Sequence, residues 1–218
     1  MSDTSKSFDA ACPFCIEFER GHFELDGKQF PRHVYQTEHF VVFPALGAFI
    51  PGWLLIAPKE HYLNTAVLSE SWSAELNEVV GRVRIALQSE YGPTVVFEHG
   101  PASWNARGGC CVEHAHIQIV SIPIDPTADL LTTFRGESIE KHSDLSTRWN
   151  HKPYLYFENQ SEEKFLFSLP DVIPSQYMRQ LIASKVGHDA QWNWRQHQFL
   201  DEMEQTIRRL RYSFPDSL

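Results

Sequence analysis

The clearest periodic feature of the chain is an apolar stripe that recurs every three or four residues. Its members are Trp72, Leu76, Val79, Val80, Val83 and Leu87. Because side chains at this spacing share one helical face, the stripe predicts an amphipathic helix. Gly92 and Pro93 follow it, and both residue types end helices. The pattern therefore predicts a helix that stops at this pair.

Short apolar segments separated by Gly and Pro predict strands on both sides of this helix. They span residues 33–37, 39–45, 53–58, 94–100 and 114–122. Strands grouped around one helix, without regular strand–helix alternation, are typical of an α+β fold. The first 125 residues thus predict a mostly antiparallel sheet with a flanking helix.

The second half of the chain has its own pattern. Residues 126–150 are polar with weak helical character, and residues 152–159 and 164–169 predict a strand hairpin. Two closing helices are predicted at 174–187 and 195–214; the second repeats Phe199, Met203, Ile207 and Leu210 on one face. We expect a loose N-terminus at 1–10, one domain at 11–124, and an extension at 125–218 that packs on the same domain.

Composition limits the classes of function. Hydrophobic residues make up 42% and charged residues 22% of the 218, as in ordinary globular proteins. The formal net charge of −9 argues against general nucleic-acid binding, which needs a basic face. No apolar run is long enough for a membrane helix, and the first residues lack the apolar core of a signal peptide. We therefore expect a cytoplasmic protein with no membrane or nucleic-acid partner.

The sequence "CPFC" places Cys12 and Cys15 three residues apart. This spacing suits a zinc knuckle, a redox pair or two buried thiols. A redox pair normally opens a helix that follows a strand in a βαβ unit, and no such unit precedes Cys12. Zinc is favoured if two further ligands exist, since structural zinc takes four. The chain has 11 histidines, and spacing alone does not select two of them.

The sequence "HAHIQIV" places His114, His116 and Gln118 at alternate positions. In a strand these side chains share one face, and the apolar residues between them face the other side. A solvated polar face is one explanation. The other is chemistry, with a histidine as metal ligand or nucleophile. A histidine whose second nitrogen is fixed by a backbone carbonyl is a good nucleophile toward phosphorus.

These segments together resemble the histidine triad (HIT) superfamily. "HAHIQIV" resembles its His-x-His-x-His strand, and glutamine at the third position is similar to the nucleotidyltransferase branch, which includes galactose-1-phosphate uridylyltransferase and diadenosine tetraphosphate phosphorylase. "WLLIAPKEH", "FEHG…GGCC" and "CPFC" resemble its Pro-Lys-x-His strand, Gly-rich phosphate loop and zinc knuckle. The resemblance covers residues 10 to 123. It implies a HIT-like catalytic domain at 11–124.

The resemblance also implies roles for individual residues. His116 would be the nucleophile that takes a nucleotidyl group, and Gln118 would hydrogen-bond the phosphoryl oxygens. Backbone and side-chain donors for the phosphate would come from Asn105, Gly109, Cys110 and Cys111. A structural zinc ion would be held by Cys12, Cys15, His61 and His114. The substrate would be a nucleotide sugar or a dinucleoside polyphosphate.

Several alternatives remain. Glutamine cannot titrate, so transfer to phosphate or a sugar phosphate is favoured over hydrolysis, with a HIT-type hydrolase as the competing possibility. A zinc-stabilised nucleotide-binding module with vestigial activity is the third, because residues 43–47 lack the acidic ribose contact of many relatives. Minimal HIT proteins commonly pair as dimers, so the oligomeric state is open between a homodimer and a chain whose extension supplies an intramolecular second half. Polar and aromatic residues at 175–180 and 190–196 either line the substrate cleft or, the favoured alternative, pack as helices.

Overall fold

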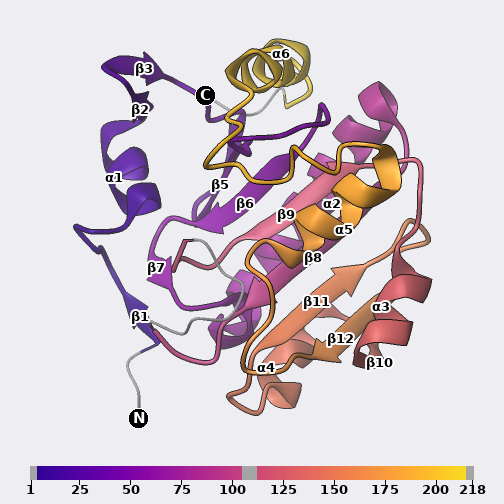
Figure 1. Cartoon of the computed structure of the whole chain (residues 1–218). Helices are drawn as coiled ribbons and strands as arrows, with labels where there is room; N and C mark the ends of the chain where they lie inside the picture. The colour runs from indigo at the N-terminus through magenta and orange to yellow at the C-terminus, as the bar shows by residue number, and fades with distance from the viewer. Residues whose placement is uncertain (1–3, 105–111, 215–218) are drawn as a thin grey trace.

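A central eight-stranded sheet organises the computed structural model, which describes residues 4–104 and 112–214 (Figure 1). The strand order is β10-β12-β11-β8-β9-β6-β5-β4, and all neighbours are antiparallel. The strands are β4 (Tyr35–Gln36), β5 (Phe40–Pro44), β6 (Leu54–Pro58), β8 (Thr94–Gly100), β9 (Ile117–Ser121), β10 (Arg135–Ile139), β11 (Tyr154–Glu158) and β12 (Lys164–Ser168).

Two small sheets and several helices surround it. The small sheets pair β1 (Ser5–Lys6) with β7 (His61–Tyr62), and β2 (Phe23–Leu25) with β3 (Lys28–Phe30). The α-helices are α1 (Pro13–Arg20), α2 (Glu70–Tyr91), α3 (Thr127–Thr133), α4 (Leu145–Arg148), α5 (Tyr177–Val186) and α6 (Leu200–Leu210), with short 3₁₀ turns η1 (Thr65–Val67) and η2 (His142–Asp144). Among the described residues, no helix combines the length and the apolar character that a membrane crossing needs.

Each face of the large sheet has its own apolar core. On one face Phe43 and Phe97 belong to a cluster that includes residues of α1 and α5. On the other face Val42 and Val96 pack with residues of α2. In Figure 1 α5 lies in front of the sheet and α2 behind it. Since both faces are covered, β5 and β6 are buried at every position, which explains their continuous apolar sequences.

The predicted α+β fold class is confirmed. The predicted helix is α2; its N-terminus is capped by the Ser69 hydroxyl, which accepts a hydrogen bond from the backbone N–H of Trp72 at 3.3 Å, and Gly92 is the C-cap. The predicted hairpin is β11–β12, and both closing helices are present. One strand is shorter than predicted: β9 begins at Ile117, so His114 and His116 lie in the extended segment before it.

Other elements were missed because tertiary contacts create them. Residues 135–139 form β10, an exposed edge strand without apolar alternation, which pairs with β12 along its whole length. Ser5 and Lys6, expected to be loose, pair with β7. A helix begins at Pro13 inside the CxxC sequence, where proline suits the first turn. The large sheet also contains strands from both sides of residue 124, the predicted end of the domain, because β8 pairs with β11.

Candidate functional site

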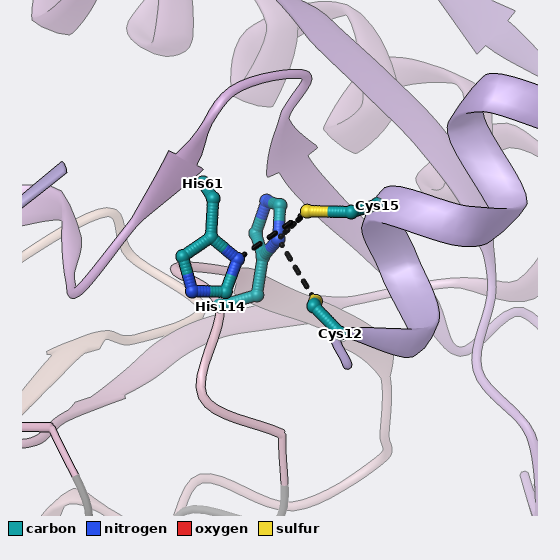
Figure 2. A group of neighbouring side chains, drawn as sticks. All are labelled: Cys12, Cys15, His61 and His114. Atoms are coloured by element: carbon teal, nitrogen blue, oxygen red, sulfur yellow. Dashed lines mark hydrogen bonds between the residues drawn. The ribbon is translucent and has the colours of Figure 1, made fainter. Parts of the chain in front are cut away.

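Four buried side chains from three separate parts of the chain meet beside α1 (Figure 2). Cys12 caps α1 and Cys15 lies in its first turn. His61 opens β7, and His114 lies just before β9. One nitrogen or sulfur atom from each of the four lies within 4.8 Å of the others. The structure thus brings together the four residues predicted as metal ligands.

The ring orientation of the histidines leaves nitrogen atoms directed at the thiols. The Cys12 Sγ lies 3.4 Å from the His114 Nδ1, and the Cys15 Sγ lies 3.3 Å from the His61 Nδ1. The Nε2–H of His114 donates to the Pro58 carbonyl oxygen at 2.8 Å. This bond leaves the lone pair of His114 on Nδ1, which faces the cluster. A histidine held in this way is typical of a metal ligand.

The charges of the cluster also fit a cation. Burial raises the pKa of the Cys12 thiol to about 12, so its thiolate needs a neighbouring cation to form at neutral pH. Burial lowers the pKa of His114 to about 3, so its ring stays neutral, as a ligand must. Two sulfur and two nitrogen donors match a structural zinc site. The redox alternative has little support, since the sheet neighbours of the described chain are antiparallel and form no βαβ unit.

His116 lies two residues beyond the cluster and faces a different space. Its Nδ1–H donates to the carbonyl oxygen of His114 at 2.7 Å. This bond assigns the proton to Nδ1 and leaves a lone pair on Nε2. Burial lowers the pKa of His116, so its ring is neutral at physiological pH. A neutral imidazole with a free Nε2 is the nucleophilic form.

A cavity of about 150 Å³ lies against His116 and Gln118. Its walls are largely apolar and come from distant parts of the chain. They include Phe14 of α1, Leu46 after β5, Phe97 of β8, Tyr177 and Arg179 of α5, and Trp194. The extension therefore contributes part of the wall. Pockets of this kind, apolar with a few polar groups, are typical ligand sites.

Trp53, which directly precedes the neighbouring strand β6, orients the side chain of Gln118. The Nε1–H of Trp53 donates to the Oε1 of Gln118 at 3.0 Å. Since this bond uses the amide oxygen, the amide NH₂ of Gln118 is directed away from Trp53 and can donate to an anion. Trp53 is completely buried, so its ring is a rigid support. The side chains of Gln118 and His116 thus line one cavity.

A buried ion pair forms another part of the wall. The Arg32 guanidinium donates from Nε and Nη2 to the two carboxylate oxygens of Glu17 at 2.8 and 2.6 Å. It also packs on the rings of Phe23 and Phe43, at 4.5 and 4.7 Å from their centroids. Burial alone would raise the pKa of Glu17, but hydrogen bonds from Arg32 and His33 outweigh it and hold that pKa below its usual value. The pair is a neutral, bidentate unit.

The predicted phosphate-binding residues cannot be placed in this site. Asn105, Gly109, Cys110 and Cys111 lie outside the described residues. His99, near the end of β8, lines the cavity.

The sequence did not indicate Trp53 or the Glu17–Arg32 pair as site residues, because each gains its place only when distant elements pack. For Gln176, Tyr177, Arg179 and Trp194 the structure favours the cleft-lining alternative over simple helix packing.

Comparison with protein-family models finds no match. Among curated proteins, the chain is similar to CWF19-like protein 1 of Xenopus laevis, with 26% identity over 153 residues, 65% of this chain and 27% of that protein. It is also similar to CWF19-like protein 1 of Homo sapiens, with 26% identity over 185 residues, 78% of this chain and 33% of that protein. The chain thus spans about a third or less of the length of these relatives.

Solved structures similar to the chain include a HIT family protein from Bacillus anthracis, with 22% identity, a TM-score of 0.41, and coverage of 51% of this chain and 72% of that one. A histidine triad nucleotide-binding protein from Sulfolobus tokodaii has 26% identity, a TM-score of 0.40, and coverage of 50% and 67%. A zinc-bound histidine triad protein from Mycobacterium smegmatis has 19% identity, a TM-score of 0.40, and coverage of 63% and 88%. All three proteins are named as HIT or histidine triad proteins, the superfamily that the sequence motifs resemble. The nucleotidyltransferase branch stays a prediction.

Proposed function

We propose that this protein transfers a nucleotidyl group from a nucleoside-phosphate anhydride through a covalent intermediate on His116. The observation that carries the proposal is the hydrogen bond from the His116 Nδ1–H to the His114 carbonyl, because it leaves a lone pair on the Nε2 of a histidine that lines the cavity. The amide of Gln118 lies in the same cavity and offers N–H donors for phosphoryl oxygens. The substrate class is a nucleotide sugar or a dinucleoside polyphosphate.

In the first step the Nε2 lone pair of His116 attacks the α-phosphorus. The N–P bond forms while the bond from that phosphorus to the bridging oxygen breaks, and the oxygen leaves with the electron pair as part of a phosphate. The imidazole then carries a positive charge, which the His114 carbonyl stabilises through the Nδ1–H. Gln118 hydrogen-bonds the non-bridging oxygens. In the second step an acceptor oxygen attacks phosphorus, and Nε2 regains its electron pair.

Glutamine at position 118 favours an acceptor that is already ionised. Water must lose a proton as it attacks, and a glutamine amide cannot accept one. Inorganic phosphate and sugar phosphates carry ionised oxygens and need no base. Phosphorolysis or transfer is therefore favoured over hydrolysis. Zinc, held by Cys12, Cys15, His61 and His114, would have the structural role of joining α1, β7 and the segment before β9.

The test is direct detection of the intermediate. The protein is incubated with radiolabelled nucleotide sugars and dinucleoside polyphosphates, denatured in alkali, and examined for nucleotide that mild acid releases from the polypeptide. We expect label on the wild type, none on His116→Ala, and normal label on His151→Ala, which changes an exposed histidine. Added phosphate should discharge the label faster than water alone.

Two results would contradict the proposal. Label that survives in His116→Ala would overturn the assignment of the nucleophile. If the protein binds nucleotide but no substrate leaves label on it, the protein is instead a zinc-stabilised nucleotide-binding module, the alternative that the sequence left open.

A further inference from the structure

A buried arginine from the extension lies against the tryptophan that orients Gln118. The Arg179 guanidinium carbon is 4.6 Å from the ring centroid of Trp53, and the side chain of Arg179 lines the same cavity as His116. Arg179 belongs to the first turn of α5, some sixty residues beyond Gln118 in sequence. Its 5% exposure excludes a role as a surface cation.

The guanidinium is fixed in position by backbone carbonyls. Its Nε–H donates to the carbonyl oxygen of Trp192 at 2.8 Å, and its Nη2 donates to the carbonyl oxygen of Gly47. It also lies 5.4 Å from the ring of Phe49, which itself packs edge-on against Trp53 with centroids 5.3 Å apart. Arg179 therefore joins the loop before β6 to the segment after α5 and packs over the Trp53 ring.

The contact acts on the hydrogen bond that Trp53 makes. A cation over an indole face withdraws electron density from the ring, which makes the Nε1–H a stronger donor. That donor is the one bonded to the Gln118 Oε1 at 3.0 Å. Because hydrogen bonds in a chain polarise one another, the amide N–H groups of Gln118 become stronger donors in turn.

We propose that Arg179 is a positioning residue that acts on the phosphoryl group through Trp53 and Gln118. This inference rests on the proposed function for its catalytic meaning, since Gln118 is there the donor to the phosphoryl oxygens. The extension then supplies part of the reaction machinery as well as part of the cavity wall. Removing the guanidinium should slow the formation of the His116 intermediate while the affinity for nucleotide changes little.

The first experiment needs no substrate. In ¹⁵N-tryptophan-labelled protein, the indole N–H resonance of Trp53 is identified by its loss in Trp53→Phe. We expect it to shift upfield in Arg179→Met, which keeps an apolar side chain of similar length, and also in Gln118→Ala. The matched control is Arg84→Met, because Arg84 is an equally buried arginine whose partners are Thr94 and Glu158. The Trp53 resonance should stay in place there.

The second experiment is a double-mutant cycle on the rate of label formation. Arg179→Met should slow that rate roughly tenfold, the order expected from a desolvated cation–π contact. The contacts that lead from Arg179 through Trp53 to Gln118 are called the relay below. In the Gln118→Ala background Arg179→Met should have no further effect, since the relay is already broken. An equal effect in both backgrounds would mean that Arg179 contacts the substrate directly, and would overturn the relay.

The two experiments test the relay and the proposed enzymatic function independently of each other. If Arg179→Met leaves the Trp53 resonance unchanged in a folded protein, the relay is wrong whatever the activity. If the resonance shifts but no substrate ever labels the wild type, the relay stands and the covalent function fails. Arg179→Lys provides a second variant: it keeps a cation but cannot donate to both carbonyls, so a smaller shift in the same direction is expected.

Discussion

The Nδ1 of His116 lies 2.7 Å from the carbonyl oxygen of His114. His114 therefore takes part in two sites: its ring faces the cysteines, while its carbonyl sets the tautomer of His116. The ring is in turn held by Pro58, at the end of β6. A disturbance of the cysteine cluster that moves the backbone at residue 114 should therefore also disturb His116, the proposed nucleophile.

Loss of the metal should lower both stability and label formation. We expect one zinc per chain by elemental analysis of protein prepared with zinc present, and none in Cys12→Ser. The variant should melt at a markedly lower temperature, because structural zinc contributes directly to folding. Cys110→Ser, the same change at a cysteine outside the proposed ligand set, should keep its zinc. A zinc-free wild type that melts at the same temperature with and without chelator would contradict the assignment.

The buried pair of Glu17 and Arg32 should be costly to break. Glu17→Gln leaves a buried guanidinium without its carboxylate, and about 3 kcal/mol of unfolding free energy should be lost. The matched change is Glu24→Gln, whose partner Arg20 is exposed. There the loss should stay below about 1 kcal/mol. Urea unfolding of both variants at one pH gives the comparison, and equal losses would rule out a special contribution of burial.

Contact between the loop at Gly47 and the segment after α5 should respond to one added methyl group. A Cβ at Gly47 would lie 2.4 Å from the Cβ of Trp194, and the backbone there has φ +71°. Gly27 has a similar φ of +75° but open space around it. Gly27→Ala should thus cost only the left-handed strain of about 1 kcal/mol. Gly47→Ala should cost more and should speed protease cleavage within 188–199; identical behaviour of the two would refute a close contact.

Stability should depend on pH through Glu98. Burial raises its pKa to about 7, although Thr65 and Tyr154 donate hydrogen bonds to its carboxylate. Its ordinary value is 4.5, so between pH 4.5 and 7 the folded state binds more protons than the unfolded state. Stability from this group is therefore lost as pH rises through that window, by up to roughly 3 kcal/mol.

Glu98→Gln isolates this effect, since glutamine does not titrate. The buried His142, which contacts Thr65 at 2.9 Å, has a pKa lowered by burial to about 4, and its contribution runs the opposite way. It is present in both proteins and cancels in the difference. We expect the difference in unfolding free energy to move in favour of the variant as pH rises from 4.5 to 7. Parallel stability curves would exclude a titrating Glu98.

The CxxC motif predicted the two cysteines of the cluster, because thiolates are preferred ligands of structural zinc. His61 and His114 came from the family resemblance and not from spacing, and only the folded chain shows why they meet: β7 and the segment before β9 both lie beside α1. Periodicity likewise predicted α2 and the β11–β12 hairpin, where local pattern and tertiary packing agree.

Other features have no local pattern. β10 is an exposed edge strand that exists because β12 offers it a partner. Arg179 looks in sequence like one polar residue of an ordinary helix, and its burial against Trp53 depends on the path of the chain from residue 169 to 199. Long-range packing of this kind carries no periodic signal.

The pairing of β8 with β11 has a consequence for any shortened version of the chain. β8 is buried on both faces, and β11 covers its outer edge from Tyr154 to Glu158. A fragment that stopped at residue 124 would expose that edge as a row of unsatisfied N–H and C=O groups between apolar side chains. Such edges recruit strands from other molecules. The β11–β12 hairpin therefore protects this edge against aggregation. Expression of residues 1–124 alone should give insoluble material.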